Sequence, residues 1–512
     1  MDRYIERKRE RELLRIVKKH DDYKKIVYKS KKLSTIYHLS HVRTNILAWY
    51  DFKDNANILE IGGGYGEITG ELCNKAKHVT SLETSKGRAK VIAERHKNRK
   101  NLEVIVGSID DIEFQNKFDY IVLIGSLNFI QVFSDNNKTI EEFFDKIKIL
   151  LKNDGIILLA AECQSKIEND HFFRKIDTYK AEKNLLKESE LVDILRKIGF
   201  KHIYTYYPSP SYKFAKELCS INEKNSDSVL IEARNSERQE KIRNIKFATT
   251  RLDRFQIYTI ITEDEKNKYV RKYPLDSKAM EHLNNMCENY YKLVNVYKGK
   301  FDVVGIRKFK NGVEFDFSKG ELYQDFLLKL IDENKKSEFI EQLDRYYELL
   351  TSSAVMSDEY YKNPDFIKVY GKNACLSTGS SCMCTQLSNG DGNFDNYFIE
   401  NNRLIMIDYE WIFDFQIPVK FQMWRSIHYF FSKTKAKKIV TPNQLYRRYG
   451  ISEDEKELFK KMEKNFSYYV HGNPKINHIE RLRLAPFQYK DVINAVKKRL
   501  YSYKKYCTKV KK

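Results

Sequence analysis

Two stretches of the chain carry residues whose types and spacing could do chemistry. The first, Asn57–Thr69, reads Asn-Ile-Leu-Glu-Ile-Gly-Gly-Gly-Tyr-Gly-Glu-Ile-Thr, with a short apolar run ahead of its glycines. Glycine lacks a Cβ and tolerates positive φ, so the backbone of such a turn can approach a ligand closely. An amphipathic segment follows, and the free N–H groups of its first turn would face that ligand. The stretch therefore predicts a strand, a ligand-binding turn and a helix start.

The second stretch, Asn389–Trp411, combines carboxylates with a side-chain amide. Asp391 is followed five residues later by Asn396, and Asp408 ends the next apolar run. This layout suits phosphotransfer, in which one carboxylate orients or deprotonates an acceptor hydroxyl while the other two groups hold Mg²⁺ on the phosphates. The second stretch therefore predicts a site for a nucleotide and Mg²⁺.

Four further apolar runs indicate how the first stretch is positioned. Helical segments separate them, which predicts a parallel sheet with helices on both faces. One run ends in Glu83, at the spacing from the glycine turn that is expected of a ribose-binding acid. The runs are His78–Glu83, Leu102–Ser108, Phe118–Ser126 and Leu150–Ala160.

The order of these motifs over roughly Ser40–Arg234 resembles the class I S-adenosylmethionine (SAM) methyltransferases. The resemblance implies an α/β, Rossmann-like domain with a seven-stranded sheet and SAM as cofactor. It implies that the glycines surround the methionine portion of SAM, that Glu83 binds the ribose hydroxyls and that Ser108 and Ile109 border the adenine. The implied cofactor residues are Glu60, Gly62, Gly64, Gly66, Glu83, Ser108, Ile109 and Gly125. A dehydrogenase-type nucleotide site is the alternative, although the third glycine spacing of the dinucleotide fingerprint is missing.

The acceptor side of this domain is less well marked. We expect Phe200–Pro208 and Ser228–Arg234 to be antiparallel partners at the sheet edge, and the aromatic loop Tyr206–Tyr212 to lie near the acceptor or to pack under the sheet. His171 is a candidate base for a hydroxyl acceptor, because the pKa of histidine lies near working pH. Arg43 could reach the SAM carboxylate or have a structural part. No Asn-Pro-Pro-Tyr motif follows the fourth strand, which argues against amide or adenine-N6 methylation.

The second half of the chain shows a different succession of elements. Arg254–Ile261 and Lys268–Pro274 predict a hairpin, Asp276–Leu293 predicts a helix, and two strands follow at Asp302–Phe309 and Gly312–Phe317. The remainder, from Val419 onward, has the pattern of helices. This succession is typical of the amino-terminal lobe of a protein kinase, with a helical part behind it.

With the second stretch, this half resembles the aminoglycoside and choline phosphotransferases of the protein-kinase-like fold, a two-lobed α+β architecture. The resemblance implies that Asp391 is catalytic, that Asn396 and Asp408 are metal ligands, and that Lys272 pairs with the phosphates of ATP, held by Glu281 or Glu288. Two departures keep an inactive, ligand-binding domain open as the alternative. Asn389 stands where those families have histidine, and no glycine-rich loop precedes Arg254.

The length and the net charge of the chain limit the number of domains and the kinds of partner that these motifs can serve. A chain of 512 residues with 42% hydrophobic side chains can bury two or three cores. We expect an N-terminal helical segment at 1–39, the methyltransferase domain at 40–235, a boundary at Ser236–Arg243 and the kinase-like domain at 245–512. The net charge of +21 suits nucleic acid, anionic lipid or a phosphorylated substrate, but a composition rich in Lys, Asn, Ile and Tyr, as AT-rich coding gives, explains it equally.

The remaining sequence features bear on location. The eight cysteines show no Cys-x-x-Cys pair, so reduced thiols in the cytoplasm are the simplest interpretation. The N-terminus is too charged for a signal peptide, and no run is long enough to span a membrane. The tail Val496–Lys512 interleaves lysines with aromatic residues, which predicts either a frayed end or contact with an anionic membrane surface or a polysaccharide-assembly partner.

A methyltransferase joined to a phosphotransferase-like domain resembles bifunctional enzymes that cap or decorate bacterial surface polysaccharides. We therefore expect SAM-dependent O-methylation of a sugar or sugar phosphate, with a small-molecule or glycan acceptor, and a kinase-like domain that uses ATP and Mg²⁺. Two alternatives remain. One is an RNA methyltransferase, which only the charge favours. The other is a methyltransferase whose second domain docks or regulates without turnover.

Overall fold

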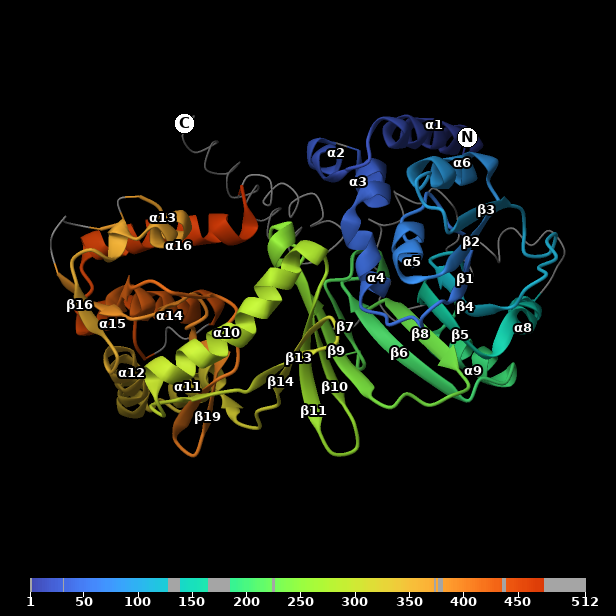
Figure 1. Ribbon diagram of the computed structural model, residues 1–512. Helices are drawn as coiled ribbons and strands as arrows, with labels where there is room; N and C mark the ends of the chain where they lie inside the picture. Colours follow the sequence, from blue (N-terminus) through green and yellow to red (C-terminus); the bar gives the residue numbers. More distant parts are fainter. Residues whose placement is uncertain are drawn as a thin grey trace, which may run out of the picture. The chain divides into compact units, whose positions relative to one another are not determined.

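The computed structural model describes residues 2–30, 32–127, 139–163, 185–222, 226–372, 374–375, 381–434 and 439–473 (Figure 1). The chain forms two compact units, which divide between Phe247 and Ala248. The predicted boundary at Ser236–Arg243 overlaps β9, Lys241–Phe247, a strand of the first unit.

The first unit is built on a sheet whose order is β3-β2-β1-β4-β5-β8-β6. Strands β1 to β5 are all parallel to their neighbours within this set, as the sequence predicts. The strand bounds are β1 Asn57–Ile61, β2 His78–Glu83, β3 Leu102–Val106, β4 Phe118–Ile124, β5 Leu151–Glu162, β6 His202–Ser209 and β8 Ser228–Arg234. This is the Rossmann-like, seven-stranded arrangement expected from the motifs.

The position of β8 differs from the prediction. It pairs antiparallel with β6, as expected, but it lies between β5 and β6 and not at the edge. The sheet then continues beyond β6 through β7, Glu217–Cys219, and β9. Sequence patterns give the existence of a strand, whereas the order of strands depends on pairing between distant segments.

Helices cover both faces of this sheet. Helices α8, Ile140–Leu150, and α9, Glu188–Lys197, contribute buried Phe144 and Leu195 to the core that contains Leu59 of β1. On the opposite face, α5, Thr69–Lys75, lies next to Glu60, whose side chain alternates with that of Leu59. Helix α6, Lys86–Arg95, packs on β2 and β3. The glycine turn is thus fixed between a buried strand and a buried helix.

The N-terminal segment packs onto this unit as short helices. They are α1 Asp2–Lys19, α2 Lys24–Lys29, α3 Leu33–Leu39, the 3₁₀ turn η1 His41–Thr44 and α4 Asn45–Ala48. Leu13 and Val17 of α1 are buried together with Tyr65 of the glycine turn and Val91 of α6. The segment from Tyr37 to Tyr50 is not one continuous helix, because the extended backbone of Ser40 ends α3. This apolar stripe explains why α1 lies on α6.

The second unit begins with the sheet β13-β14-β11-β10, antiparallel throughout. Its elements are β10 Ile257–Glu263, β11 Lys268–Pro274, α10 Met280–Tyr297, β13 Ile306–Phe309 and β14 Gly312–Asp316. The predicted hairpin, helix and following strands are present at the expected places. The first of the two later strands is divided, since β12, Asp302–Val303, pairs with β20, Arg403–Met406, in another sheet.

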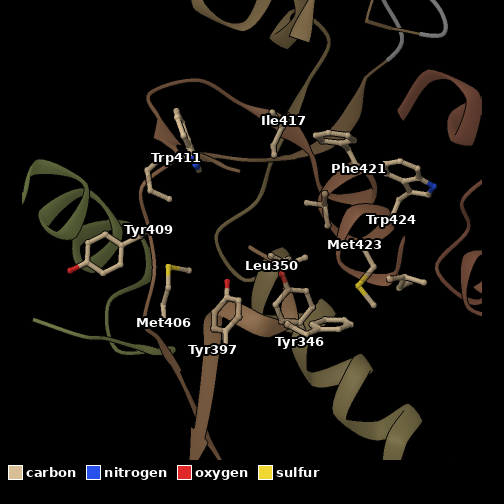
Figure 2. Packing of buried hydrophobic residues seen from close by; sticks show 14 of the residues in the cluster. Tyr346, Leu350, Tyr397, Met406, Tyr409, Trp411, Ile417, Phe421, Met423 and Trp424 are labelled. Atoms are coloured by element: carbon tan, nitrogen blue, oxygen red, sulfur yellow. The ribbon is translucent and has the colours of Figure 1, made fainter. Parts of the chain in front are cut away.

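A large aromatic core holds the rest of the second unit (Figure 2). The long helices are α11 Tyr323–Asp332, α12 Lys336–Thr351, α14 Val419–Lys433 and α16 Glu453–His471, with the shorter α13 Pro364–Tyr370 and α15 Pro442–Arg448. Tyr346, Tyr397 and Trp424 are fully buried in this core. None of the helices that the structure describes combines the length and the apolar composition of a membrane span.

Candidate functional site

The glycine turn of the first unit has a backbone that only glycine adopts readily. Gly62, Gly64 and Gly66 have φ of +76°, +59° and +78°. A Cβ at Gly62 would lie 2.5 Å from the Cβ of Ser126, so the turn passes closely over the end of β4. The turn is therefore a cradle with no side chains of its own at these three positions.

Glu83 lies at this turn, as the spacing predicts. Its Oε2 accepts a hydrogen bond from the N–H of Gly64 at 3.0 Å, and its Oε1 accepts one from the N–H of Ser85 at 2.9 Å. The side chain is buried, and burial raises the pKa of this carboxyl although Arg88, at 3.8 Å, opposes the shift. The carboxylate thus joins the ends of β1 and β2 and stands where a ligand's hydroxyls could reach it.

Glu60 lies beneath the turn and not at its open side. Its Oε2 accepts hydrogen bonds from the hydroxyls of Thr69 at 2.6 Å and Ser81 at 2.7 Å, and it would lie 3.0 Å from a Cβ at Gly63. Burial raises the pKa of Glu60 to about 7, against the two hydroxyl hydrogen bonds that lower it. In this structure Glu60 ties β1 to β2 and to α5.

The ends of β3 and β4 complete the rim. Gly125 has φ of +75°, and a Cβ there would lie 2.6 Å from the hydroxyl of Tyr212. The Oγ of Ser126 is buried and has no hydrogen-bond partner within the described part of the chain. After β3, Ser108 and the buried Ile109 follow Gly107, whose N–H donates to the carbonyl of Glu83 at 3.2 Å. The predicted cofactor residues of this unit therefore come together at the carboxyl ends of β1 to β4.

The second unit brings its predicted residues together as well. Asp391 is partly buried, and its Oδ2 accepts from the N–H of Trp411 at 2.9 Å. The Nζ of Lys272 lies 2.8 Å from Oδ1 of Asp408. The side-chain amide of Asn396 donates to the backbone carbonyl of Asp391 at 2.9 Å, which leaves its oxygen as the atom that could ligate a cation. The pKa of Asp391 is raised to about 7, mainly by burial and further by the negative charges of Asp408 and Glu410.

The prediction that Glu281 or Glu288 holds Lys272 is wrong. In the described ion pairs, the place of Glu281 or Glu288 of α10 is taken by Glu410, whose Oε1 lies 2.5 Å from Nζ of Lys272. The reason is local: Tyr409 is fully buried, its ring points toward the green helix in Figure 2, and its hydroxyl donates to the carbonyl of Val304. Its two neighbours in the Asp-Tyr-Glu run therefore project to the other side of the backbone, toward Lys272.

Helix α14 holds the loop that carries Asp391. The carbonyl of Gly392 accepts hydrogen bonds from Tyr346 at 2.7 Å, Gln422 at 2.8 Å and Ser426 at 2.6 Å. Asn389, which stands where histidine was expected, accepts the N–H of Asp391 through its side-chain oxygen at 2.9 Å. The loop is thus fixed without a histidine, by these neutral hydrogen bonds and by the guanidinium of Arg425 in α14, which donates to the carbonyl of Gly390.

Magnesium has no complete protein site among the described residues, where no group of three or more His, Cys, Asp or Glu side chains is arranged to hold a metal ion. In general, Mg²⁺ at a phosphotransfer site binds through one or two carboxylates together with substrate phosphates. Asp408 and the side-chain oxygen of Asn396 are the donors that fit such a shared site.

Comparisons with known proteins bear on the first unit. Residues 59–159 match the family model described as "Methyltransferase domain", and the match runs from β1 through β5. The chain contains a class I SAM-dependent methyltransferase domain. A search of curated proteins gave no match. The family match covers about a fifth of the chain and leaves the second unit unassigned.

Solved structures similar to the chain are methyltransferases or proteins of about the size of this domain. One is phosphoethanolamine N-methyltransferase 2 of Haemonchus contortus, at 17% identity and a TM-score of 0.31, covering 38% of this chain and 52% of that one. Another is the YcgJ protein of Bacillus subtilis, at 14% identity and a TM-score of 0.29, where the match covers 39% of this chain and 100% of that one. A SAM-dependent methyltransferase of Aquifex aeolicus is 14% identical with a TM-score of 0.29, and the match covers 40% of this chain and 97% of that one. The chain thus spans about half the length of the first of these proteins.

SAM fits the residues that the methyltransferase domain presents. The glycine cradle excludes side chains at the turn, the orphaned Oγ of Ser126 offers a polar partner, and Glu83 offers a carboxylate beside the cradle. These donors and acceptors suit a ligand that carries an amino acid portion at one end and ribose hydroxyls at the other.

Three side-chain contacts near the cradle of the methyltransferase domain were not predicted from the sequence. Nδ1 of His38 in α3 lies 2.5 Å from Oε1 of Glu67, whose Oε2 accepts the N–H of Tyr65. Burial would raise the pKa of Glu67, but the hydrogen bond from His38 lowers it to about 2. In addition, Glu10 of α1 accepts a hydrogen bond from Ser85 at 2.6 Å, and Glu6 pairs with Arg88. The four-residue spacing of Glu6 and Glu10, which puts both on one helix face, was the available signal.

The acceptor-side predictions have mixed outcomes. Arg43 donates to the carbonyl of Lys213 at 3.1 Å and its guanidinium lies over the ring of Tyr37, which is the structural alternative. The predicted loop Tyr206–Tyr212 is wrong at its start, because Tyr206 belongs to β6 and pairs with Leu230 of β8. Its side chain is buried against Trp49, with ring centroids 5.3 Å apart. His171 lies outside the described residues.

Proposed function

We propose that the methyltransferase domain transfers a methyl group from SAM to a hydroxyl of a sugar or sugar phosphate in a cell-surface polysaccharide. The single observation that supports the cofactor part is the hydrogen bond from the N–H of Gly64 to Glu83, because it puts the proposed ribose acceptor beside the glycine turn. SAM supplies a methyl group on a sulfonium, which needs only a nucleophile placed in line.

The chain's residues would bind and orient both reactants. The glycine cradle and Ser126 would hold the amino acid portion of SAM, and Glu83 the ribose. Tyr212, buried next to Gly125 at the end of β4, would line the place where an acceptor sugar enters. A hydroxyl nucleophile must also lose a proton, for which His171 remains the proposed base.

We further propose that the second unit transfers phosphate from ATP to a hydroxyl. Asp391 would accept the proton of that hydroxyl, a role that suits a carboxyl whose pKa is raised to about 7. Asp408 and Asn396 would hold Mg²⁺, and Lys272 would pair with the phosphates. The loop fixed by α14 supports this assignment, because a preorganised carboxylate is what phosphotransfer requires of the protein.

Acceptor assays with tritiated SAM test the first proposal. We expect the full chain to label sugar phosphates or surface oligosaccharides and to leave total RNA unlabelled. Labelling of RNA alone, with binding that weakens steeply as salt rises, would establish the RNA methyltransferase alternative instead. SAM binding without transfer to either class of acceptor would favour a regulatory protein.

The proposed location is the cytoplasm, with the basic tail reaching an anionic surface at the inner face of the membrane. Lysine-rich segments gain roughly 1 kcal/mol per charge near such a surface. Sedimentation of the full chain with vesicles containing phosphatidylserine tests this, using the double variant Lys504→Glu and Lys505→Glu. Equal sedimentation of both proteins would refute a role for the tail.

A further inference from the structure

One buried carboxylate in the second unit holds two cations. Oε1 of Glu410 lies 2.5 Å from Nζ of Lys272, and its Oε2 lies 2.5 Å from Nη1 of Arg251. Nε2 of His282 is 3.5 Å from the same Oε2. The side chain of Glu410 is 4% exposed, so both ion pairs are shielded from water.

Arg251 lies just ahead of β10, in the segment where a kinase-like domain would carry the glycine-rich loop that covers the phosphates of ATP. The sequence has no such loop here. The guanidinium lies over the ring of Trp411, 5.4 Å from its centroid, and the Arg251 side chain is 19% exposed, compared with 5% for Lys272. Arg251 is therefore the more open of the two cations.

The geometry of the guanidinium leaves it able to bind a ligand. Its hydrogen bonds to described residues, to Glu410 and to the carbonyl of Phe255, all start at Nη1. A guanidinium has five N–H donors in a planar fork that matches phosphate oxygens. Arg251 can thus keep its bond to Glu410 and still offer a second edge to an anion.

The formal charges of the cluster also favour binding of an anion at Arg251. Three carboxylates, Asp391, Asp408 and Glu410, share the site with two cations, Lys272 and Arg251. With all three carboxylates ionised, three negative and two positive charges sum to −1 before Mg²⁺ binds and to +1 with it, and Arg251 supplies one of the positive charges. A polyphosphate needs that positive charge, since its own negative charges have no glycine-rich loop to receive them.

We propose that Arg251 is a second phosphate-binding cation of this site, and that Glu410 positions both Arg251 and Lys272 for the polyphosphate of a nucleoside triphosphate. The proposal rests on the phosphotransfer function proposed above. In this proposal the Arg251 side chain donates to the phosphates in place of the backbone N–H groups of a glycine-rich loop. If Arg251 only balanced the charge of Glu410, its loss would lower stability and leave nucleotide affinity unchanged.

Titration calorimetry of the full chain with ATP and Mg²⁺, and separately with tripolyphosphate and Mg²⁺, tests the proposal. We expect Arg251→Gln to lower the affinity for both ligands by about ten- to a hundredfold, which is the range for the loss of one charge-assisted hydrogen bond. Arg254→Gln is the matched control, because Arg254 is exposed, three residues away, and stacks on Phe255 and Tyr469. That variant should bind both ligands like the wild type.

Further variants separate positioning from folding. Arg251→Lys keeps the charge but not the fork, so it should restore part of the affinity. Glu410→Gln should weaken the binding of tripolyphosphate as well, while peptides of α14 keep their wild-type protection in hydrogen exchange, which reports that the second unit is folded. Wild-type affinity in Arg251→Gln would overturn this inference and leave the phosphotransfer proposal standing. Failure of the wild type to bind ATP with Mg²⁺ would overturn both.

Discussion

Replacement of Gly62 by alanine should destabilise the methyltransferase domain more than the same change at another glycine of positive φ. Gly62 has φ of +76°, which costs an alanine about 1–2 kcal/mol. The new Cβ would also lie 2.5 Å from the Cβ of Ser126, and such overpacking costs about 1–3 kcal/mol. Gly199, with φ of +94° and nothing within 4 Å of the position that a Cβ would take, carries only the first cost. We therefore expect Gly62→Ala to cost about 1–3 kcal/mol more than Gly199→Ala.

Hydrogen exchange measured by mass spectrometry over a urea series gives the free energy of opening for peptides of β1 and β4. The double variant Gly62→Ala with Ser126→Gly should recover most of the difference, because the clashing Cβ is then gone. Gly62→Ala should also weaken SAM binding, since the turn must move. Equal destabilisation by Gly62→Ala and Gly199→Ala, or no recovery in the double variant, would refute the close approach of the turn to β4.

Three other predictions test separate contacts. Burial raises the pKa of Glu60 from 4.5 to about 7, so between these pH values the folded state holds a proton that the unfolded chain has released. The free energy of unfolding should therefore fall by up to about 3 kcal/mol as pH rises through this range. Urea unfolding at several pH values should show that Glu60→Gln removes this pH dependence, and an unchanged pH dependence would contradict the prediction. Asp408→Asn should weaken ATP with Mg²⁺ at least about tenfold by calorimetry, whereas Asp414→Asn, at an exposed ion pair, should not. Ser426→Ala should destabilise the second unit by about 1 kcal/mol in hydrogen exchange, because the carbonyl of Gly392 loses one donor; no change would mean that the bond contributes nothing.

Much of the methyltransferase domain could be predicted because its signals are local. The glycine turn and the bounds of β2, His78–Glu83, follow from short runs of residue types, and the place of Glu83 at the turn follows from its spacing. The insertion of β8 between β5 and β6 could not be predicted, since it depends on pairing between strands far apart in sequence. The bond between His38 and Glu67 was missed for the same reason.

The second unit shows where a resemblance misleads. It suggested that a glutamate of α10 would hold Lys272, by analogy with kinases. The Asp-Tyr-Glu run carried a better signal, because alternation puts Asp408 and Glu410 on one side once Tyr409 is committed to the core. Arg251 gave no sequence signal, since its role depends on the carboxylate it meets 159 positions away.

The most direct test of the central claim is a calorimetric titration of the full chain with SAM, repeated with Glu83→Gln and Glu103→Gln. Glu103 lies on the neighbouring strand β3, and its side chain is 57% exposed, so it is a matched control. We predict that the wild type and Glu103→Gln bind SAM equally and that Glu83→Gln binds about ten- to a hundredfold more weakly. Absence of SAM binding in the wild type, or equal affinity in Glu83→Gln, would contradict the assignment of the site.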